Sequence, residues 1–512
     1  MNNMKISGPV PGNEGSGGQA SLSGRVARGT AWIVAARLVM RVFGFMNTII
    51  VAYLLVPEDF GLVALGLTMM QLLHGFSDIG VSQAVVKFRD ASRNDLDTLF
   101  TLSTLRGLLI ASILLIIAPF AAEFYEDQRV MYVFAGISIY PVLTGLMNPK
   151  FFEFERNLDF SREFWVLVLN KMAGVAVSIL VAFIFRTYWA IVLGLLTNGL
   201  VQLVLSYGLK AYRPRFSLAS LKKVIGFSGW LTGVSFAAAL NNKLDVLVLG
   251  RTAGADGAGN FYIGLQLAGL PTSELAYPMS RALYPGLSEL QGCEDRMRIA
   301  YLGGVEALGA VAIPAAIGFA FIAHELISLL LGVKWINAVP VVEVITPALG
   351  FQTLFLATQH YAMALGRTKL VFLREMAFFF IRTPIIVASA LSYGIVGAAY
   401  AVAATGVIHA ILNMALYKRV SNASLMDPIW AARRSLMAVA IMAAILFLVD
   451  HILAEMTPIF LSLVLKILVG LMAFAGVMLT LWRLEGQPEG VEKTLLRLGS
   501  SQLSRIRRHN TR

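Results

Sequence analysis

Long apolar runs separated by short polar segments repeat from one end of the chain to the other. Most runs are near 20 residues, the length that a helix needs to cross a hydrocarbon layer of about 30 Å. Unbroken runs of this kind satisfy their backbone groups in lipid only as helices, and the alternating segments of a membrane barrel do not occur. About fourteen transmembrane helices are predicted, at residues 30–55, 62–84, 98–120, 130–148, 164–185, 189–209, 225–250, 262–285, 298–323, 338–362, 369–391, 394–417, 435–453 and 457–482.

The composition excludes an ordinary soluble protein. The chain is 57% hydrophobic and 14% charged, with a mean hydropathy of +0.72, whereas soluble domains carry about 25% charged residues. A single cysteine, Cys293, allows no internal disulfide, and no HxxxH, HExxH or CxxC spacing occurs. We therefore predict an all-α polytopic membrane protein with no metal site.

The distribution of Lys and Arg predicts the orientation of the helices. Cytoplasmic connections retain positive charge and short translocated connections do not. Of the 42 Lys and Arg residues, only Arg129, Arg186, Arg251 and Lys334 fall in the connections on one side of the predicted topology. That side is predicted to be external, with both termini in the cytoplasm. Most of the net charge of +12 thus reflects topology and not binding to nucleic acid.

A basic connection at 210–224 separates two sets of six predicted helices. A shift of the chain by 198 residues aligns three positions, each at the start of an apolar helix: Gly61 with Gly259, Gly66 with Gly264 and Leu67 with Leu265. An even number of spans per repeat gives a parallel repeat. The predicted organisation is a disordered cytoplasmic tail (1–24), a six-helix lobe (25–209), a basic linker (210–224), a second six-helix lobe (225–417), two extra helices (418–483) and a basic cytoplasmic tail (484–512).

Cations inside the spans are the main candidates for function, because an ionisable group in lipid is costly unless it has a partner or an aqueous path. Arg37 and Arg41 lie one turn apart on one face of the first helix. An arginine fork suits a pyrophosphate or carboxylate. The first lobe sets its cations against Asp78 alone, so a structural pair of Arg37 or Arg41 with Asp78 is the alternative. The candidate substrate-binding residues are Arg37, Arg41, Arg106, Lys171 and Arg382.

Four of the span cations lie near the predicted cytoplasmic ends. Arg106, Lys171, Arg281 and Arg374 are four to eight residues from these ends, where a long side chain can also extend to the interface. Arg382 lies near the middle of its span, where that is hardest. The sequence leaves open which of these side chains face a substrate.

A second polar group lies in the second lobe, where oxygen ligands could hold a coupling cation or a proton. Ion pairs of Lys243 with Asp245 or with Glu274 are the alternative interpretation. The candidate coupling or gating residues are Asp78, Asn241, Lys243, Asp245 and Glu274.

Four segments together resemble a known family. They read YLLVPEDFG at 53–61, FSLASLKKVIGFSGWLT at 216–232, LYPGLSELQ at 283–291 and LGVKW at 331–335. These segments are similar to the polysaccharide-exporter, or lipid-linked oligosaccharide flippase, branch of the multidrug/oligosaccharidyl-lipid/polysaccharide exporter superfamily, near colanic-acid-type exporters. The resemblance covers roughly 23–417.

The resemblance implies a transporter in which two lobes give alternating access to an undecaprenyl-pyrophosphate-linked oligosaccharide, for exopolysaccharide, capsule or O-antigen synthesis. It implies energy from a Na⁺ or H⁺ gradient and no bound cofactor. The implied partners are the lipid-linked oligosaccharide, membrane lipids, a polysaccharide polymerase and a chain-length regulator.

Two other functions are weaker interpretations of the sequence. A multidrug or cation exporter of the same superfamily would favour an acidic first lobe over one with Arg37 and Arg41. A polysaccharide polymerase or ligase needs large external loops with catalytic groups, and the longest predicted external connection is about 14 residues. No GxxxxGK[ST] loop is present. We therefore expect a transporter and not an enzyme.

Overall fold

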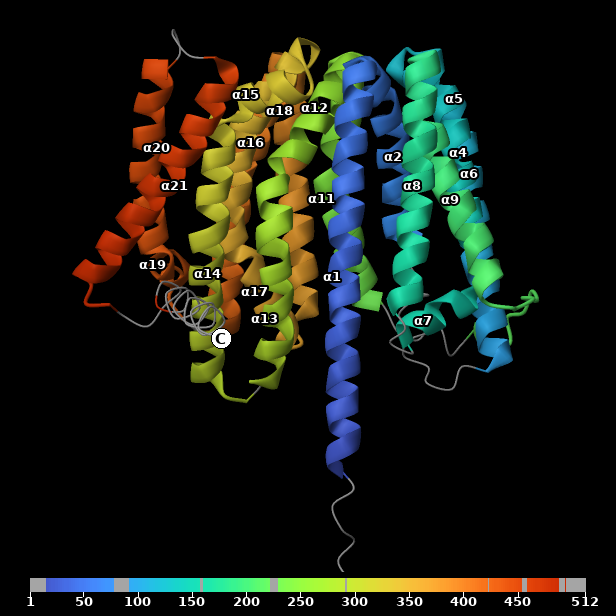
Figure 1. Cartoon of the computed structure of the whole chain (residues 1–512), viewed down its shortest axis with the longest axis horizontal. Helices are drawn as coiled ribbons and strands as arrows, with labels where there is room; N and C mark the ends of the chain where they lie inside the picture. Colours follow the sequence, from blue (N-terminus) through green and yellow to red (C-terminus); the bar gives the residue numbers. More distant parts are fainter. Residues whose placement is uncertain are drawn as a thin grey trace, which may run out of the picture.

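The computed structural model describes residues 15–77, 92–156, 160–221, 229–290, 292–421, 423–453, 458–487 and residue 493. Every regular element in these ranges is a helix, which confirms the predicted all-α class. The helices stand roughly side by side in two groups, with one further pair at the edge of the second group (Figure 1).

The first group contains the helices that precede the basic linker, with α1, α4 and α8 as its longest members. Its elements are α1 (Gly15–Leu54), α2 (Pro57–Ser77), α4 (Arg93–Tyr125), α5 (Gln128–Ile137), α6 (Ile139–Gly145), η1 (Pro149–Phe152), α7 (Glu153–Arg156), α8 (Phe160–Phe185) and α9 (Trp189–Leu209).

The second group follows the linker, and α20 and α21 flank it at the left of Figure 1. Its elements are α11 (Gly229–Thr252), α12 (Gly254–Ala268), η2 (Thr272–Ala276), α13 (Tyr277–Glu289), α14 (Glu294–Phe321), α15 (Ala323–Leu330), η3 (Val333–Ala338), α16 (Val339–Gln352), η4 (Thr353–Phe355), α17 (Leu356–Ala364) and α18 (Thr368–Ser421). The flanking elements are α19 (Asp427–Ala431), α20 (Arg433–Leu453) and α21 (Ile459–Leu484).

Ten helical segments of the described chain are long and apolar enough to cross a membrane. One of them, α18, contains two predicted spans that meet at Gly394, whose φ of 59° lies in the left-handed region that suits glycine. The other predicted spans coincide with α5 and α6, with α11, and with the run from α12 to α13. The number fourteen remains a prediction.

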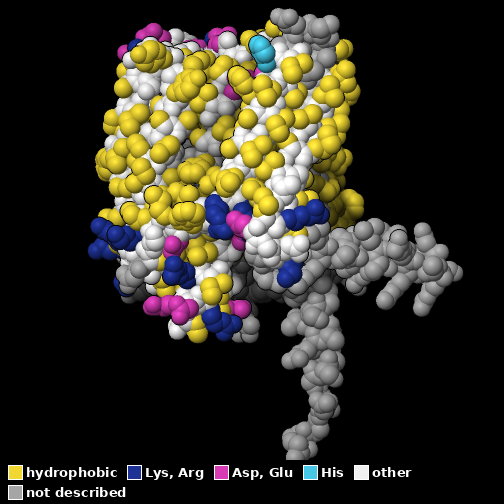
Figure 2. Space-filling model, turned by 90° about the vertical axis from the view of Figure 1, so that its left-hand side faces the viewer, with side chains coloured by type: hydrophobic (Ala, Val, Ile, Leu, Met, Phe, Trp, Pro, Cys, Tyr) yellow, Lys and Arg dark blue, Asp and Glu magenta, His cyan; other side chains and the backbone are white. Residues whose placement is uncertain are grey.

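The surface has the belt expected of a multi-pass membrane protein. Figure 2 shows a broad band of hydrophobic side chains, with charged side chains gathered toward the two ends. Large apolar residues such as Phe447, Leu471 and Met472 on the flanking pair are more than half exposed. Such a surface is stable only against lipid.

The two lobes share a core at one end of the molecule. We call the end where α1 stops and α2 begins, at the top of Figure 1, the upper face, and the opposite end the lower face. One buried cluster joins Leu65 and Leu114 of the first lobe to Phe261 and Ile345 of the second. Toward the lower face, the cluster around Tyr301 draws, among described residues, only on the second lobe and the flanking elements. The shared core of the two lobes therefore lies at the upper face. Contacts between the lobes continue along α2 and α11, where the ring centroids of Phe76 and Phe236 are 5.2 Å apart.

The tightest contact between the lobes is the crossing of α2 and α12. A Cβ on Gly61 would lie 1.7 Å from the carbonyl oxygen of Ala255, and one on Gly259 would lie 1.8 Å from that of Pro57. The two contacts are equivalent under the shift of 198 residues. The aligned glycines thus meet each other across the lobe interface, and only glycine permits this approach.

The linker is bonded to the lower end of α4. The Tyr212 hydroxyl donates to Asp97 at 2.6 Å and the backbone amide of Arg215 donates to the same carboxylate at 2.9 Å. The amide of Ser217 donates to the Thr101 hydroxyl. Burial, and then the adjacent Asp97 carboxylate, raise the pKa of Tyr212. The described part of the linker is thereby attached to the first lobe.

Candidate functional site

An ion pair between the two lobes involves Arg41, one of the two arginines predicted to share a face of the first helix. The guanidinium of Arg41 on α1 contacts the carboxylate of Glu274 on η2, and both side chains remain partly exposed, at 51% and 39%. Arg37, one turn earlier on α1, is exposed. From the sequence, Arg41 was a candidate for substrate binding and Glu274 a candidate for ion coupling. The structure places these two side chains in contact.

Glu274 lies in a helical turn with an unusual geometry. Thr272–Ala276 forms a π-helix between α12 and α13, where the sequence predicted one regular helix. Pro271 precedes it and has no backbone amide to donate, and Pro278 follows. A π turn inside a longer helix is frequently found at a functional site. This turn carries Glu274 toward α1.

Two further predicted cations lie in the first lobe. Arg106 on α4 bonds to Nδ1 of His74 on α2 at 2.7 Å. Lys171 on α8 lies beside α1, since a Cβ built on Gly44 would be 3.7 Å from its Nζ. Both side chains are only half-buried.

Arg382 lies apart from these cations, in a buried pair of the second lobe. Its two terminal nitrogens donate to the two carboxylate oxygens of Asp245, at 2.9 and 2.6 Å, and one of them also contacts the Asn241 carbonyl oxygen. Arg382 and Asp245 are 8% and 2% exposed. A bidentate pair of this kind aligns α18 with α11. The pair occupies both carboxylate oxygens of Asp245, whereas the side-chain oxygen of Asn241, another predicted ligand, is buried and has no hydrogen-bond partner among the described residues.

The buried network extends beyond this pair. The Asn241 amide donates to the Glu375 side chain at 3.0 Å. Arg374 contacts Glu375 and Asn413 and donates to Gln359 at 3.3 Å. Arg374 is 7% exposed, so it does not extend to the interface. From the sequence, Glu375 was expected to pair with a cation of the second lobe, but the network was not included among the candidate site residues.

The remaining coupling candidates are placed only in part. Lys243 on α11 is half-buried, and Asp245 and Glu274 form their ion pairs with arginines instead of with Lys243. Neither alternative pair of Lys243 occurs among the described residues. Asp78 lies outside the described residues, and so do the alternative pairs with Arg37 and Arg41.

The second lobe also holds the end of α1 at the upper face. Lys334 donates to the carbonyl oxygens of Tyr53, at 2.6 Å, and of Leu55. The Trp335 indole donates to the Ala52 carbonyl at 2.9 Å. These carbonyls are at the end of α1, where a helix leaves its acceptors unpaired. Two of the four segments that carried the family resemblance, at 53–61 and 331–335, thus contact each other.

Charged residues add to the closure of the upper face. Arg251 pairs with Glu126 across the lobes at 2.9 Å, and Arg129 bridges Glu58 and Asp127 within the first lobe. Burial alone would raise the pKa of Asp127, but its hydrogen bonds from Arg129 outweigh this and hold the pKa below its usual range. Lys334, Arg251 and Arg129, all predicted external, lie at this one face.

Two helical lobes in a hydrophobic belt, closed at one face, define a two-lobed membrane transporter. The chain belongs to the family of polysaccharide biosynthesis proteins, whose profile matches residues 50–340. The family membership that the loop segments predicted is confirmed.

Known relatives are similar at low identity over most of their length. The chain is 24% identical over 329 residues to the lipopolysaccharide biosynthesis protein WzxC of Escherichia coli (strain K12), covering 64% of this chain and 67% of that one. It is 22% identical over 350 residues to the succinoglycan biosynthesis transport protein ExoT of Rhizobium meliloti (strain 1021), covering 68% and 71%.

Solved structures share the fold. The lipid II flippase MurJ, in an inward closed conformation, superposes with a TM-score of 0.68 at 14% identity, covering 88% of this chain and 98% of that one. An inward-facing multidrug transporter of the MATE family gives 0.57 at 13% identity, covering 78% and 94%. At these identities the likeness concerns the fold alone.

Proposed function

We propose that this protein flips an undecaprenyl-pyrophosphate-linked oligosaccharide across the bacterial inner membrane, for exopolysaccharide, capsule or O-antigen synthesis, and has no enzyme activity. The observation that carries the proposal is the half-exposed Arg41 and Glu274 pair between the lobes, with Arg37 beside it. Membership of a polysaccharide biosynthesis family supports the substrate class. The relative ExoT is named as a transport protein.

The mechanism follows from competition for Arg41. A pyrophosphate offers several charged acceptors that suit the arginine fork, so it replaces the Glu274 carboxylate as the partner of Arg41. Arg37, one turn away, reaches the same group. Loss of the ion pair releases α1 from η2, and the lobes can then rearrange. Substrate binding thereby shifts the equilibrium between the two arrangements of the lobes, because the substrate competes with the contact that holds one of them.

Ion coupling belongs to the same proposal. Glu274 is a better candidate for ion coupling than Asp245, because its carboxylate is partly exposed and its partner Arg41 must leave it during transport. Asp245 would have to lose a buried bidentate arginine before it could hold Na⁺. We therefore propose that protons, and not Na⁺ at Asp245, drive the cycle. Glu274→Gln should then remove the response of transport to a pH gradient.

The proposed orientation places the upper face outside and both termini in the cytoplasm. The lower face, where the two lobes have separate cores, then faces the leaflet where lipid-linked sugars are assembled. The released substrate would pass to a polysaccharide polymerase and a chain-length regulator on the outer side.

The test is the double variant Arg37→Ala, Arg41→Ala in cells that lack the native gene. We expect polymer export to be lost while the amount of protein in the membrane is unchanged. Arg367→Ala is the matched control, since Arg367 is exposed in the connection between α17 and α18. Normal export by the double variant would refute the cationic site.

A further inference from the structure

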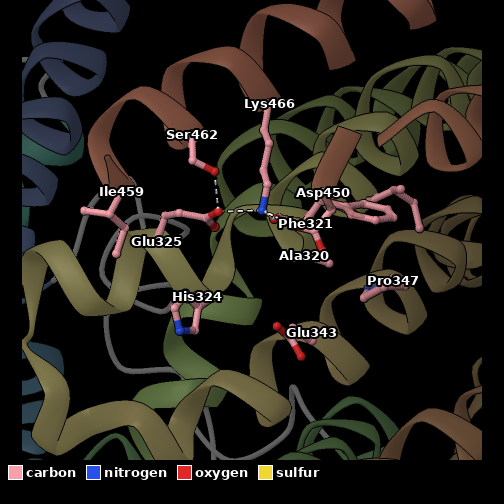
Figure 3. A pocket seen from close by; sticks show the side chains of 11 residues that line it. Ala320, Phe321, His324, Glu325, Glu343, Pro347, Asp450, Ile459, Ser462 and Lys466 are labelled. Carbon is pink, nitrogen blue, oxygen red and sulfur yellow. Dashed lines mark hydrogen bonds and ion pairs between the residues drawn. The ribbon is translucent and has the colours of Figure 1, made fainter. Parts of the chain in front are cut away.

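A charged cavity lies away from the lobe interface, beside the flanking helix pair. It has a volume of about 760 Å³ and opens between the end of α14, α15 and α16 on one side and α20 and α21 on the other. Figure 3 shows its side chains pointing inward from these helices. The polar lining residues are His324, Glu325, Glu343, Asp450, Ser462 and Lys466.

The cavity carries more negative than positive charge. Lys466 is its one ammonium group and is 4% exposed. It bonds to Glu325 and Asp450, and donates to the Phe321 carbonyl oxygen at 3.2 Å. Three carboxylates thus line the cavity with one lysine, and of the three only Glu325 is buried. This excess of negative charge attracts a cation.

Two carboxylates have capacity left for such a cation. Glu325 is 5% exposed, and one of its oxygens accepts from Ser462 and Lys466 while the other, Oε2, has no partner. Glu343, on the opposite wall in Figure 3, is exposed to the cavity and makes no hydrogen bond or ion pair within the described chain. A buried acceptor without a donor is unfavourable.

An apolar groove adjoins the cavity. It has a volume of about 370 Å³ between α14, α20 and α21, and its lining includes Gly318, Gly470, Leu471 and Phe474. Lys466 lines both the groove and the cavity. A ligand that fills both needs an apolar chain and a cationic head.

The depth of the cavity suits the head group of a lipid. Asp450 is in the last turn of α20, and Lys466 is two turns into α21. At 1.5 Å per residue, Lys466 is about 10 Å along the helix from its first residue. The cavity is therefore near the membrane interface at the upper face.

We propose that this cavity and groove bind phosphatidylethanolamine, with its primary ammonium on Glu343 and the free oxygen of Glu325 and an acyl chain in the groove. A pyrophosphate-linked substrate would meet the excess of carboxylates, so the site is separate from the substrate passage. The bound lipid joins the flanking helices to the second lobe. This inference does not depend on the proposed function, because its test measures binding.

The experiment is a titration of the purified full-length protein with three phospholipids, followed by native mass spectrometry. Phosphatidylethanolamine should bind about tenfold more tightly than anionic phosphatidylglycerol, which corresponds to about 1.4 kcal/mol. It should also bind more tightly than phosphatidylcholine, whose quaternary ammonium has no N–H to donate. Glu343→Gln should remove both preferences.

Glu289→Gln is the matched control, since Glu289 is exposed at the lower end of α13, and it should leave both preferences unchanged. Asp450→Asn is a second variant, whose amide keeps the shape of the side chain; it should also weaken phosphatidylethanolamine binding. Equal binding of the three lipids by the native protein, or an unchanged preference in Glu343→Gln, would overturn the proposal.

Discussion

The ion pair of Arg41 with Glu274 can be separated from a purely structural contact by reversing its charges. In the double variant Arg41→Glu, Glu274→Arg the attraction between α1 and η2 is kept, but the cation moves to the other lobe. If the pair only holds the lobes together, export should recover relative to Arg41→Glu alone. We expect it to stay below about one tenth of the native rate, because the pyrophosphate has lost the Arg41 guanidinium as a hydrogen-bond donor and meets a carboxylate beside Arg37 instead. Export rates at equal protein levels give the answer.

The ion pair of Arg382 with Asp245 contributes to the stability of the fold. Arg382→Met leaves a buried carboxylate without its partner, and such losses destabilise a protein by about 3–5 kcal/mol. The double variant Arg382→Met, Asp245→Leu removes both charges and should recover most of the loss. Thermal unfolding in detergent measures both. A single variant as stable as the native protein would show that the pair contributes nothing.

At this scale the sequence was informative about which residues are unusual and uninformative about their partners. The spacing of Arg37 and Arg41 follows from helix geometry, so one shared face could be predicted. The partner of Arg41 could not, because Glu274 is in another lobe and reaches α1 only through a π turn. Arg382 was singled out correctly as a mid-span cation. Whether it faces a substrate or Asp245 depends on the packing of α18 against α11, which no local pattern contains.

At the scale of the element, the crossing of α2 and α12 is the contact most sensitive to one added carbon. Gly61→Ala places a methyl group against the Ala255 carbonyl, so the helices must separate or the contact is lost. Such overpacking costs about 1–3 kcal/mol. We expect a lower midpoint of thermal unfolding and reduced export.

Gly208→Ala is the control for this variant, because a Cβ on Gly208 meets nothing within 4 Å. It should leave export unchanged and should not lower the midpoint of thermal unfolding, since alanine is the better helix former. If Gly61→Ala behaved like the control, the upper face could not depend on the close approach of these two helices.

The helices themselves were the most predictable part of the chain. The span at 189–209 coincides with α9, Trp189–Leu209, and most other predicted spans differ by a few residues at each end. Hydropathy contains this information because lipid imposes one length on every crossing. It does not contain the π turn at Thr272–Ala276 or the continuation of α18 through Gly394, since both depend on backbone geometry within an apolar run.

At the scale of the whole molecule, closure of the upper face was not predicted from the sequence. The glycines at 61 and 259 were recognised only as a repeat, and LGVKW only as part of a family resemblance. The contact of Gly61 with Gly259 follows from the symmetry of the fold, because equivalent helices of a parallel repeat meet at the axis that relates them. The sequence repeat was therefore consistent with this crossing of α2 and α12, but only the structure identifies it.

The proposed orientation makes a prediction for the only cysteine of the chain. Cys293 is exposed between α13 and α14 at the lower face, so a membrane-impermeant maleimide added to spheroplasts should not label it until the membrane is opened. In the variant Cys293→Ser, Val333→Cys the only thiol lies at the upper face, where Val333 is 77% exposed, and it should be labelled from outside in intact spheroplasts. Both sites border short connections, so the comparison tests orientation and not access. The reverse pattern would place the upper face, where the lobes share their core, in the cytoplasm, and would contradict the proposed orientation.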